Sequence, residues 1–233
     1  MIDYKYTYLI GSLIALIVWT FFFTYRKDTR REMLTLSLLF GIVGIFAEYL
    51  YIQDWWRPLT ITGTAIGIED FLFGFSVGGV FAVAYEEIFK KRLKIKKKTK
   101  KQNIKRDIQF IFSIILILFI FAIIYLISGI NSFVLTILIF LTGIFIILIK
   151  RKDLIKDSLF SGLIALGLSV VVYQIIYAIT PGFFDEFWLY ENIGRITLLK
   201  IPLEELVWFF LAGAFIGPLY EYWKGAELKD INK

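Results

Sequence analysis

Long apolar runs alternate with short polar segments along the whole chain. Each run holds roughly 18–25 residues, and a helix of that length crosses the hydrocarbon core of a bilayer, which is about 30 Å thick. The pattern therefore predicts an all-α polytopic membrane protein with seven transmembrane helices. The seven runs lie at about residues 8–25, 33–53, 66–89, 108–128, 132–149, 157–179 and 199–223.

The basic residues are concentrated in alternate connections between these runs. Of the 26 lysines and arginines, 22 lie near residues 26–31, 90–106 and 150–156 or after residue 223. Cytoplasmic loops of membrane proteins carry an excess of Lys and Arg. The N-terminus is therefore predicted to lie outside and the C-terminus in the cytoplasm. The Ile- and Lys-rich composition points to the plasma membrane of an archaeon or a bacterium.

An acidic segment occurs twice in the chain. The sequence IEDFLFGF at 68–75 recurs 135 positions later as LEELVWFF at 203–210, and Tyr85-Glu86 recurs as Tyr220-Glu221 at the same offset. At an offset of 126, Arg26 aligns with Lys152, Gly41 with Gly167, Glu48 with Gln174 and Tyr51 with Tyr177. The first three helices therefore match the last three.

An additional helix must separate two parallel copies, because three spans reverse the direction of the chain. The run at 108–128 carries no polar motif and fills this role. The predicted architecture is 3+1+3, with parallel repeats related by a pseudo-twofold axis along the membrane normal. Three domains follow: a first three-helix repeat at 1–92, a basic linker plus helix four at 93–131, and a second repeat at 132–233.

Composition excludes several kinds of chemistry. The chain has no Cys and no His, so disulfides, thiolate catalysis, zincin-type sites and Ser-His-Asp triads are all absent. Proton chemistry must then use Asp, Glu, Tyr or Lys. No nucleotide or flavin motif follows a strand, and the sequence predicts no cofactor and no metal ion. The eleven cations at 90–106 are interpreted as a linker over anionic lipid headgroups, and no nucleic-acid partner is expected.

Acidic residues gather near the predicted outer face. Acids in the first turn of a helix complement its dipole, so helix capping explains single examples. Matched pairs inside membrane helices indicate function instead. Arg57 and Arg195 lie in adjoining outer loops and can pair with some of the acids. The five predicted carboxylates are Glu48, Glu69, Asp70, Glu204 and Glu205.

The two Tyr-Glu pairs end the same two helices on the predicted cytoplasmic side. Tyrosine is typical of the interfacial aromatic belt of membrane proteins. The acids are expected to pair with nearby lysines at the surface, namely Lys90, Lys91 or Lys224.

The segment at 201–210, IPLEELVWFF, together with Tyr220-Glu221, resembles the lycopene cyclase domain of carotenoid biosynthesis. The pattern of that family is Pro-x-Glu-Glu, two residues and then two aromatics, on the last of three membrane helices. A Trp-containing loop precedes it, and here Trp188 takes that position in the second half, as Trp55 and Trp56 do in the first. The first motif departs from the pattern, because it lacks Pro, has Asp70 as its second acid, and has Gly74 at the first closing aromatic.

The resemblance implies a redox-neutral intramolecular lyase or isomerase of the lycopene beta-cyclase kind, acting on a carotenoid or other isoprenoid hydrocarbon within the bilayer. An acid protonates the end of a linear polyene, an internal double bond attacks the carbocation, and a base removes a proton. Glu204 and Glu205 are then expected as the acid/base pair, with Glu69 and Asp70 as an equivalent or supporting pair. The expected substrate-binding residues are Phe73, Trp208, Phe209, Phe210 and Glu48.

Three other functions remain open at this stage. A small 3+1+3 transporter shares the predicted topology, but its site would need polar residues near the midplane, where this chain is almost wholly apolar. A seven-helix photoreceptor needs a Lys deep in its last helix, and Lys200 stands at the mouth of that helix. A structural membrane protein would leave the duplicated acids without a role. The oligomeric state is not determined by the sequence.

Overall fold

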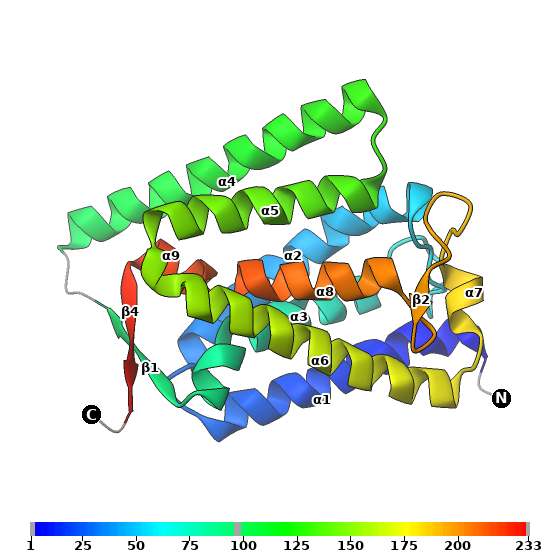
Figure 1. Ribbon diagram of the computed structural model, residues 1–233, viewed down its shortest axis with the longest axis horizontal. Helices are drawn as coiled ribbons and strands as arrows, with labels where there is room; N and C mark the ends of the chain where they lie inside the picture. Colours follow the sequence, from blue (N-terminus) through cyan, green and yellow to red (C-terminus); the bar gives the residue numbers. More distant parts are fainter. Residues whose placement is uncertain (1–2, 96–98, 232–233) are drawn as a thin grey trace.

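The computed structural model describes residues 3–95 and 99–231. Its long helices run along one common axis, with the N-terminus at one end of the bundle and the C-terminus at the other (Figure 1). We call these the N-terminal end and the C-terminal end. Seven described helical segments are long and apolar enough to span a bilayer, as predicted. The long helices are α1 (Thr7–Tyr25), α2 (Arg30–Asp54), α3 (Ile68–Ile88), α4 (Lys100–Ser128), α5 (Ser132–Lys150), α6 (Ile155–Ile179) and α8 (Leu203–Ile216).

Short elements close both ends of the bundle. The N-terminal end carries the 3-10 turn η1 (Tyr4–Tyr6), helix α7 (Phe183–Phe187) and a hairpin of β2 (Thr197–Leu198) and β3 (Ile201–Pro202). The 3-10 turn η2 (Lys152–Leu154) precedes α6. At the C-terminal end, β1 (Lys91–Ile95) pairs antiparallel with β4 (Ala226–Asp230).

The seventh span differs from the single helix predicted at 199–223. The β2–β3 hairpin occupies its first positions, so α8 begins only at Leu203. The span is then divided at Gly217-Pro218 into α8 and α9 (Leu219–Lys224). Proline has no backbone N–H and clashes with the preceding turn, which explains the break at this point.

The basic linker contains regular secondary structure in its described parts. Its first part forms β1, in which Lys91 Nζ lies 2.6 Å from Asp230 Oδ1 of the C-terminal strand. Its last part belongs to α4, which begins at Lys100 rather than 108 because Thr99 and Gln102 form a reciprocal capping box. The placement of this linker over lipid headgroups stays a prediction, and residues 96–98 lie outside the described residues.

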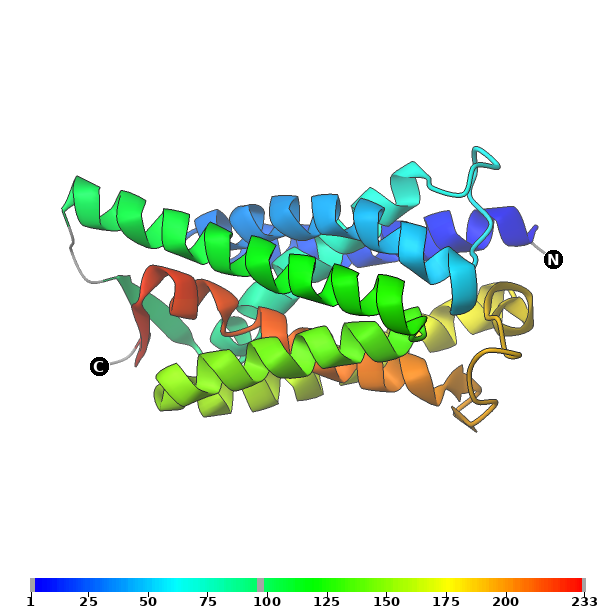
Figure 2. The same cartoon turned by 90° about the horizontal axis from the view of Figure 1, so that it is seen from above.

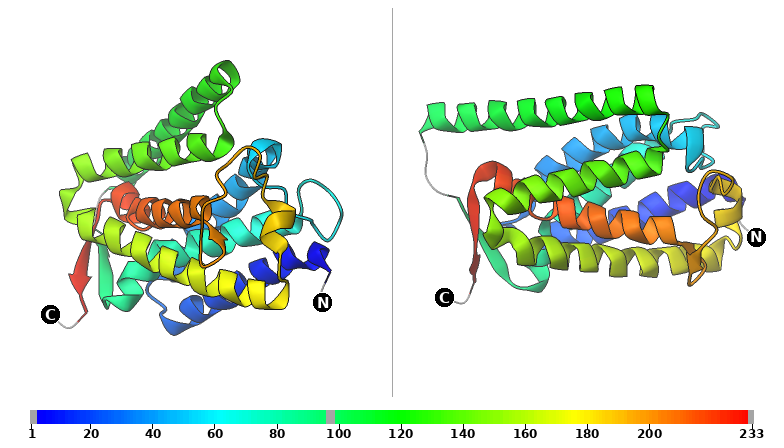
Figure 3. Two further views of the ribbon diagram at one scale, coloured as in Figure 1. Left: turned by 45° about the vertical axis from the view of Figure 1, so that its right-hand side comes forward. Right: turned by 45° about the horizontal axis from the view of Figure 1, so that its top comes forward.

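Helix α4 lies on the outside of the bundle, as two orthogonal views show (Figures 1 and 2), and it carries no buried residue. It contacts α5 and α9, whereas the closest helix packing is between α2 and α3 and between α6 and α8. Further views show α4 standing apart from the other helices along most of its length (Figure 3). Its exposed side chains, such as Leu126 and Ile127, are apolar and suit contact with lipid.

Arg26 and Arg151 make the same set of contacts at the C-terminal end. Each forms an ion pair of 2.6 Å with the aspartate two residues later, Asp28 or Asp153. Each also donates to the backbone carbonyl of the Tyr-Glu glutamate, which is Glu86 for Arg26 and is Glu221 for Arg151. Arg26 therefore corresponds to Arg151 at an offset of 125, and the predicted alignment with Lys152 is wrong at this position.

The expected surface pairing of the two Tyr-Glu acids is wrong. Glu86 and Glu221 are buried inside the C-terminal end of the bundle, with no hydrogen-bond partner on their carboxylate oxygens among the described residues. Two of the lysines expected to pair with them are engaged elsewhere. Lys91 contacts Asp230, and Lys224 contacts Asp107 at 3.1 Å.

Gly74 explains one departure of the first acidic motif from the second. It stands at the position of Phe209 in the second copy, and its Cα lies where α3 crosses α2. A Cβ at this site would overlap the backbone carbonyl oxygen of Phe40 in α2. The close crossing of α2 and α3 therefore requires glycine, and an aromatic side chain has no room.

Replacing Gly74 with alanine is expected to lower the stability of the folded protein by about 1–3 kcal/mol, because the added methyl group forces the two helices apart. Gly167→Ala on α6 is the matched control, since nothing lies within 4 Å of its Cβ position. There alanine should be neutral or stabilising, because glycine is the poorer helix former by about 1 kcal/mol. Melting temperatures of the two variants in detergent measure the difference, and equal values would contradict the close contact.

Candidate active site

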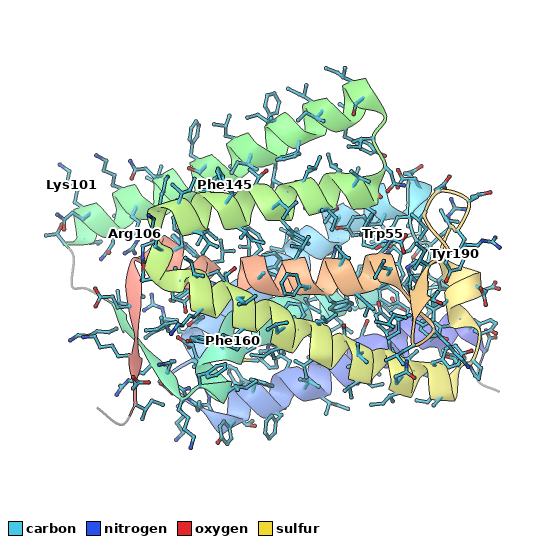
Figure 4. All side chains as sticks on the ribbon, in the orientation of Figure 1. Trp55, Lys101, Arg106, Phe145, Phe160 and Tyr190 are labelled. Atoms are coloured by element: carbon cyan, nitrogen blue, oxygen red, sulfur yellow. The ribbon has the colours of Figure 1, made fainter. Side chains whose placement is uncertain are left out.

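Three carboxyl groups line one cavity toward the N-terminal end of the bundle. Asp70 in the first turn of α3, Glu205 in the first turn of α8 and Glu48 near the end of α2 all border a cavity of ≈ 550 Å³. All three are buried. The rest of the lining is mostly apolar and comes from all seven long helices, with Trp55 among the side chains that crowd this end (Figure 4).

The first acid of each duplicated pair does not line this cavity. Glu69 Oε1 accepts a 2.7 Å hydrogen bond from the backbone N–H of Ile61, and Glu204 Oε1 accepts a 3.0 Å bond from the N–H of Gly194. Each acid is therefore hydrogen-bonded to the backbone of the loop that precedes its helix. Neighbouring residues on a helix point about 100° apart, so the two acids of one motif cannot face the same space.

Asp70 is held by donors on both of its oxygens. Oδ1 accepts a 2.8 Å hydrogen bond from the Tyr8 hydroxyl of α1, and Oδ2 accepts a 2.7 Å bond from the backbone N–H of Gly67. The second bond is half of a capping arrangement at the start of α3. The first ties α1 to α3, so it fixes the direction in which this carboxyl group points.

Glu205 has a corresponding set of partners in the second half of the chain. Oε2 accepts a 2.7 Å bond from the Tyr173 hydroxyl of α6, and Oε1 accepts a 3.0 Å bond from the indole N–H of Trp188. Both partners are buried. The carboxyl group is therefore held by two neutral donors.

Glu48 differs from the other two carboxyl groups in the cavity. Its Oε2 accepts a 3.2 Å bond from the indole N–H of Trp56, while its buried Oε1 has no hydrogen-bond partner among the described residues. Of the three groups, Glu48 thus has the least hydrogen-bond support for a negative charge.

Two tryptophan loops meet over the acids. The backbone N–H of Arg57 donates to Phe187 O at 2.7 Å, and the N–H of Leu189 donates to Trp55 O at 2.9 Å. This pairing brings the Trp56 and Trp188 rings to 5.2 Å between centroids. The loops of the two halves therefore support each other, and each supplies an indole N–H to a carboxyl group below.

The predicted substrate-binding aromatic residues do not all line the same cavity. Phe73 and Trp208 line the large cavity, with ring centroids 6.2 Å apart. Phe209 borders a smaller cavity of ≈ 80 Å³ between α1, α3 and α6, which shares Phe73 with the large one. Phe210 lies against Gly162 of α6 and lines neither cavity.

The acids in the cavity have no basic counterpart. Among the residues that the structure describes, no ion pair involves Glu48, Asp70 or Glu205. The expected role for the two outer arginines is wrong, because Arg57 donates to Ile52 O and Arg195 lies over the Tyr190 ring. Bringing three carboxyl groups into an apolar space without a cation favours keeping a proton among them.

The residues that sequence reasoning missed are the hydroxyl donors Tyr8 and Tyr173. Tyr8 sits in an apolar run 62 positions before Asp70, and nothing in the local pattern connects the two. For Tyr173 a signal existed, since the offset of 125 defined by the arginines aligns it with Glu48. The predicted counterpart Gln174 instead donates to Leu199 O at 2.7 Å.

The family model described as lycopene cyclase matches the chain over residues 3–88 and 131–223, which is more than half of its length. The match confirms the resemblance carried by the second acidic motif. No curated protein and no solved structure matches the chain.

Proposed function

The chain belongs to the lycopene cyclase family and is a multi-pass membrane protein with a role in carotenoid cyclisation, and from this premise we propose that it closes a ring at the end of a linear polyene by acid catalysis. One observation carries the proposal. Glu48, Asp70 and Glu205 share an apolar cavity of ≈ 550 Å³ with no basic residue paired to them in the described chain. Such a cavity suits a hydrocarbon and keeps a proton away from water.

Glu48 is proposed as the proton donor. Its unpartnered Oε1 makes the neutral acid the less costly form to bury, whereas Asp70 and Glu205 each accept two hydrogen bonds. Hydrogen bonds to a carboxylate favour its charged form. Asp70 and Glu205 are therefore assigned as the anions that stabilise positive charge on the substrate.

The proposed reaction conserves electrons and protons. Glu48 gives its proton to the terminal double bond, which leaves a tertiary carbocation on the neighbouring carbon. An internal double bond attacks that carbon, closes a six-membered ring and carries the positive charge onto the ring. Glu205 then removes a proton from a carbon next to the charge, which forms the ring double bond. The proton returns from Glu205 to Glu48 across the cavity, so the enzyme is restored without a redox step.

Aromatic faces support the same assignment. Phe73 and Trp208 border the cavity beside the acids. The negative face of an aromatic ring attracts a cation, by about 0.5–2 kcal/mol per contact depending on desolvation. A carbocation that moves along the substrate would therefore meet favourable surfaces between the donor and the base.

The lining also supports access from the bilayer. Leu118, Phe121 and Ala122 of the peripheral helix α4 border the cavity together with Val43 and Ala47 of α2. We propose that a carotenoid or related isoprenoid reaches the acids between these two helices. The proposed orientation puts the N-terminal end outside and the C-terminal end in the cytoplasm of an archaeal or bacterial cell, with the two three-helix segments as parallel repeats.

Expression in bacteria that accumulate lycopene tests the proposed reaction. The wild-type chain is expected to convert linear pigment into cyclic carotenoids, which chromatography with absorption spectra separates. A Glu48→Gln/Glu205→Gln double variant serves as the inactive control, and fluorescence-detected size exclusion verifies insertion and folding. Wholly linear pigment beside a folded wild-type protein would contradict the proposal and would reopen the transporter alternative.

A further inference from the structure

A second group of acids lies at the opposite, C-terminal end of the bundle. Glu32 of α2, Glu86 of α3 and Glu221 of α9 each contribute a carboxylate oxygen to a cluster whose members all lie within 4.8 Å of one another. The three side chains are at most 1% exposed. Sixteen residues of α3 separate Glu86 from Asp70, about 24 Å of helix, so this cluster is distinct from the cavity described above.

The oxygens of the cluster have no protein partner. None of the six carboxylate oxygens of Glu32, Glu86 and Glu221 accepts a hydrogen bond within the described residues. A fourth buried acid, Asp157 of α6, accepts from Ser161 on Oδ1 and leaves Oδ2 unpartnered. Seven buried acceptor atoms therefore lack a donor in one region, and each such atom would cost free energy on burial.

Two arginines near the cluster already have other partners. Arg26 forms ion pairs with Asp28 and Glu87 and donates to the carbonyls of Glu86 and Lys91. Arg151 makes the equivalent contacts with Asp153 and with the Glu221 and Ala226 carbonyls. These guanidinium groups satisfy the backbone around the acids, and among the described residues no ion pair involves the carboxylates of Glu32, Glu86 or Glu221.

The spacing of the oxygens suits a bound divalent cation. Carboxylate oxygens lie about 2.0–2.1 Å from Mg²⁺ and about 2.3–2.6 Å from Ca²⁺, so opposite ligands of one ion are about 4–5 Å apart. The 4.8 Å limit of the cluster falls within that range. Oxygen-only ligation favours Mg²⁺, Mn²⁺ or Ca²⁺, and the absence of Cys and His from the chain leaves no thiolate or imidazole ligand.

The cluster also has a cavity beside it, and two of the residues that border this cavity, Asp28 and Arg92, are exposed. A cavity of ≈ 170 Å³ is bordered by Glu32 and Glu86 together with Asp28, Arg31 and Arg92. A water molecule occupies about 30 Å³ of liquid, so several waters fit and can complete the coordination of an ion. Asp28 and Arg92 lie toward the polar segments that close this end.

We propose that Glu32, Glu86 and Glu221 bind a hard divalent cation, with Asp157 beside it as a fourth acid. Glu32 and Glu86 come from the first segment that matches the family model, while Asp157 and Glu221 come from the second. The ion would therefore join the two halves of the bundle at the end opposite the cavity of Glu48, Asp70 and Glu205. Without the ion, the repulsion among the four acids can be relieved only if some of them are protonated or if the helices move apart.

Binding of Mn²⁺ to the full-length protein in detergent tests this site. Titration followed by electron paramagnetic resonance is expected to give about one saturable ion per chain, which Mg²⁺ or Ca²⁺ displaces in competition. Glu86→Gln/Glu221→Gln should weaken Mn²⁺ binding by at least about tenfold, because two anionic ligands are lost. Glu186→Gln is the control, since it removes the same charge from an exposed position at the other end.

Thermal melting separates a metal site from a purely structural cluster. At an ion concentration about 100 times the Kd, Mn²⁺ should raise the melting temperature of the wild type by about 5 °C or more relative to EDTA, and should leave the double variant unchanged. In EDTA the variant should melt at or above the wild type, because glutamine removes like-charge repulsion. If the double variant fails to fold, Glu32→Gln provides the same comparison. No saturable binding by the wild type, or equal binding by the variants, would overturn the proposal.

Discussion

Replacing Glu205 with glutamine is expected to reduce ring formation by about 10²–10⁴-fold, the range over which a positioned acid or base contributes to catalysis. Glutamine has nearly the same shape and can still accept from the Tyr173 hydroxyl or the Trp188 indole. It cannot take up the proton that the ring cation must lose, and it carries no charge to stabilise that cation. The yield of cyclic pigment in lycopene-accumulating cells measures the loss.

Glu204→Gln is the matched control for this variant. It makes the same chemical change one residue earlier, where the carboxyl group faces a loop and Oε1 accepts from the Gly194 N–H. A glutamine oxygen can keep that bond, so ring formation should fall by less than about tenfold. If both variants lost activity equally, the adjacent pair would act together, as the sequence alone suggested, and the division between cavity-facing and loop-facing acids would be wrong.

Glu48→Gln is expected to have an effect of similar size, about 10²–10⁴-fold, because it removes the proposed source of the proton. The comparison is with Glu69→Gln. Both glutamates are buried, and each has one carboxylate oxygen without a partner in the described structure. Only Glu48 borders the cavity, whereas Glu69 accepts from the Ile61 N–H of a loop.

Comparing the two variants therefore distinguishes a role in the proposed reaction from the effect of changing any buried glutamate. Glu69→Gln should lower the melting temperature if it loosens the loop, but the folded fraction should still form rings. Glu48→Gln should remain folded and keep its hydrogen bond from the Trp56 indole. Retained ring formation in a folded Glu48→Gln protein would assign the donor role to Asp70 or Glu205 instead, and the Asp70→Asn variant would then decide between them.

The membrane fold was largely predictable from the pattern of apolar residues. A bilayer imposes a minimum apolar length on every span, and that length can be read directly from the chain. Local chemistry shifted the boundaries, since Pro218 divides the last span and the capping box at Thr99 begins α4 early. The correct alignment of Arg26 with Arg151 is present in the sequence itself, in the RKD triplets at 26–28 and 151–153.

The candidate site was predictable in part. The sequence pointed to the acidic segments of α3 and α8, and the structure buries Glu69, Asp70 and Glu205 there. It did not separate the two acids of each motif, although helix geometry alone requires them to diverge. It also missed Tyr8 as a partner of Asp70, because a hydroxyl in an apolar helix has no local feature that identifies its contact.

The sequence by itself determined the number of spans, the duplicated acidic motif and membership of the carotenoid cyclase family, because these depend on residue type and spacing along the chain. Only the tertiary structure decided that Glu48, Asp70 and Glu205 border one cavity, and that Glu32, Glu86 and Glu221 converge at the other end. The reason is physical. A helix that is apolar on nearly every side carries little periodic signal for its rotation. Close crossings such as that at Gly74 set the rotation and thereby choose which carboxyl groups meet.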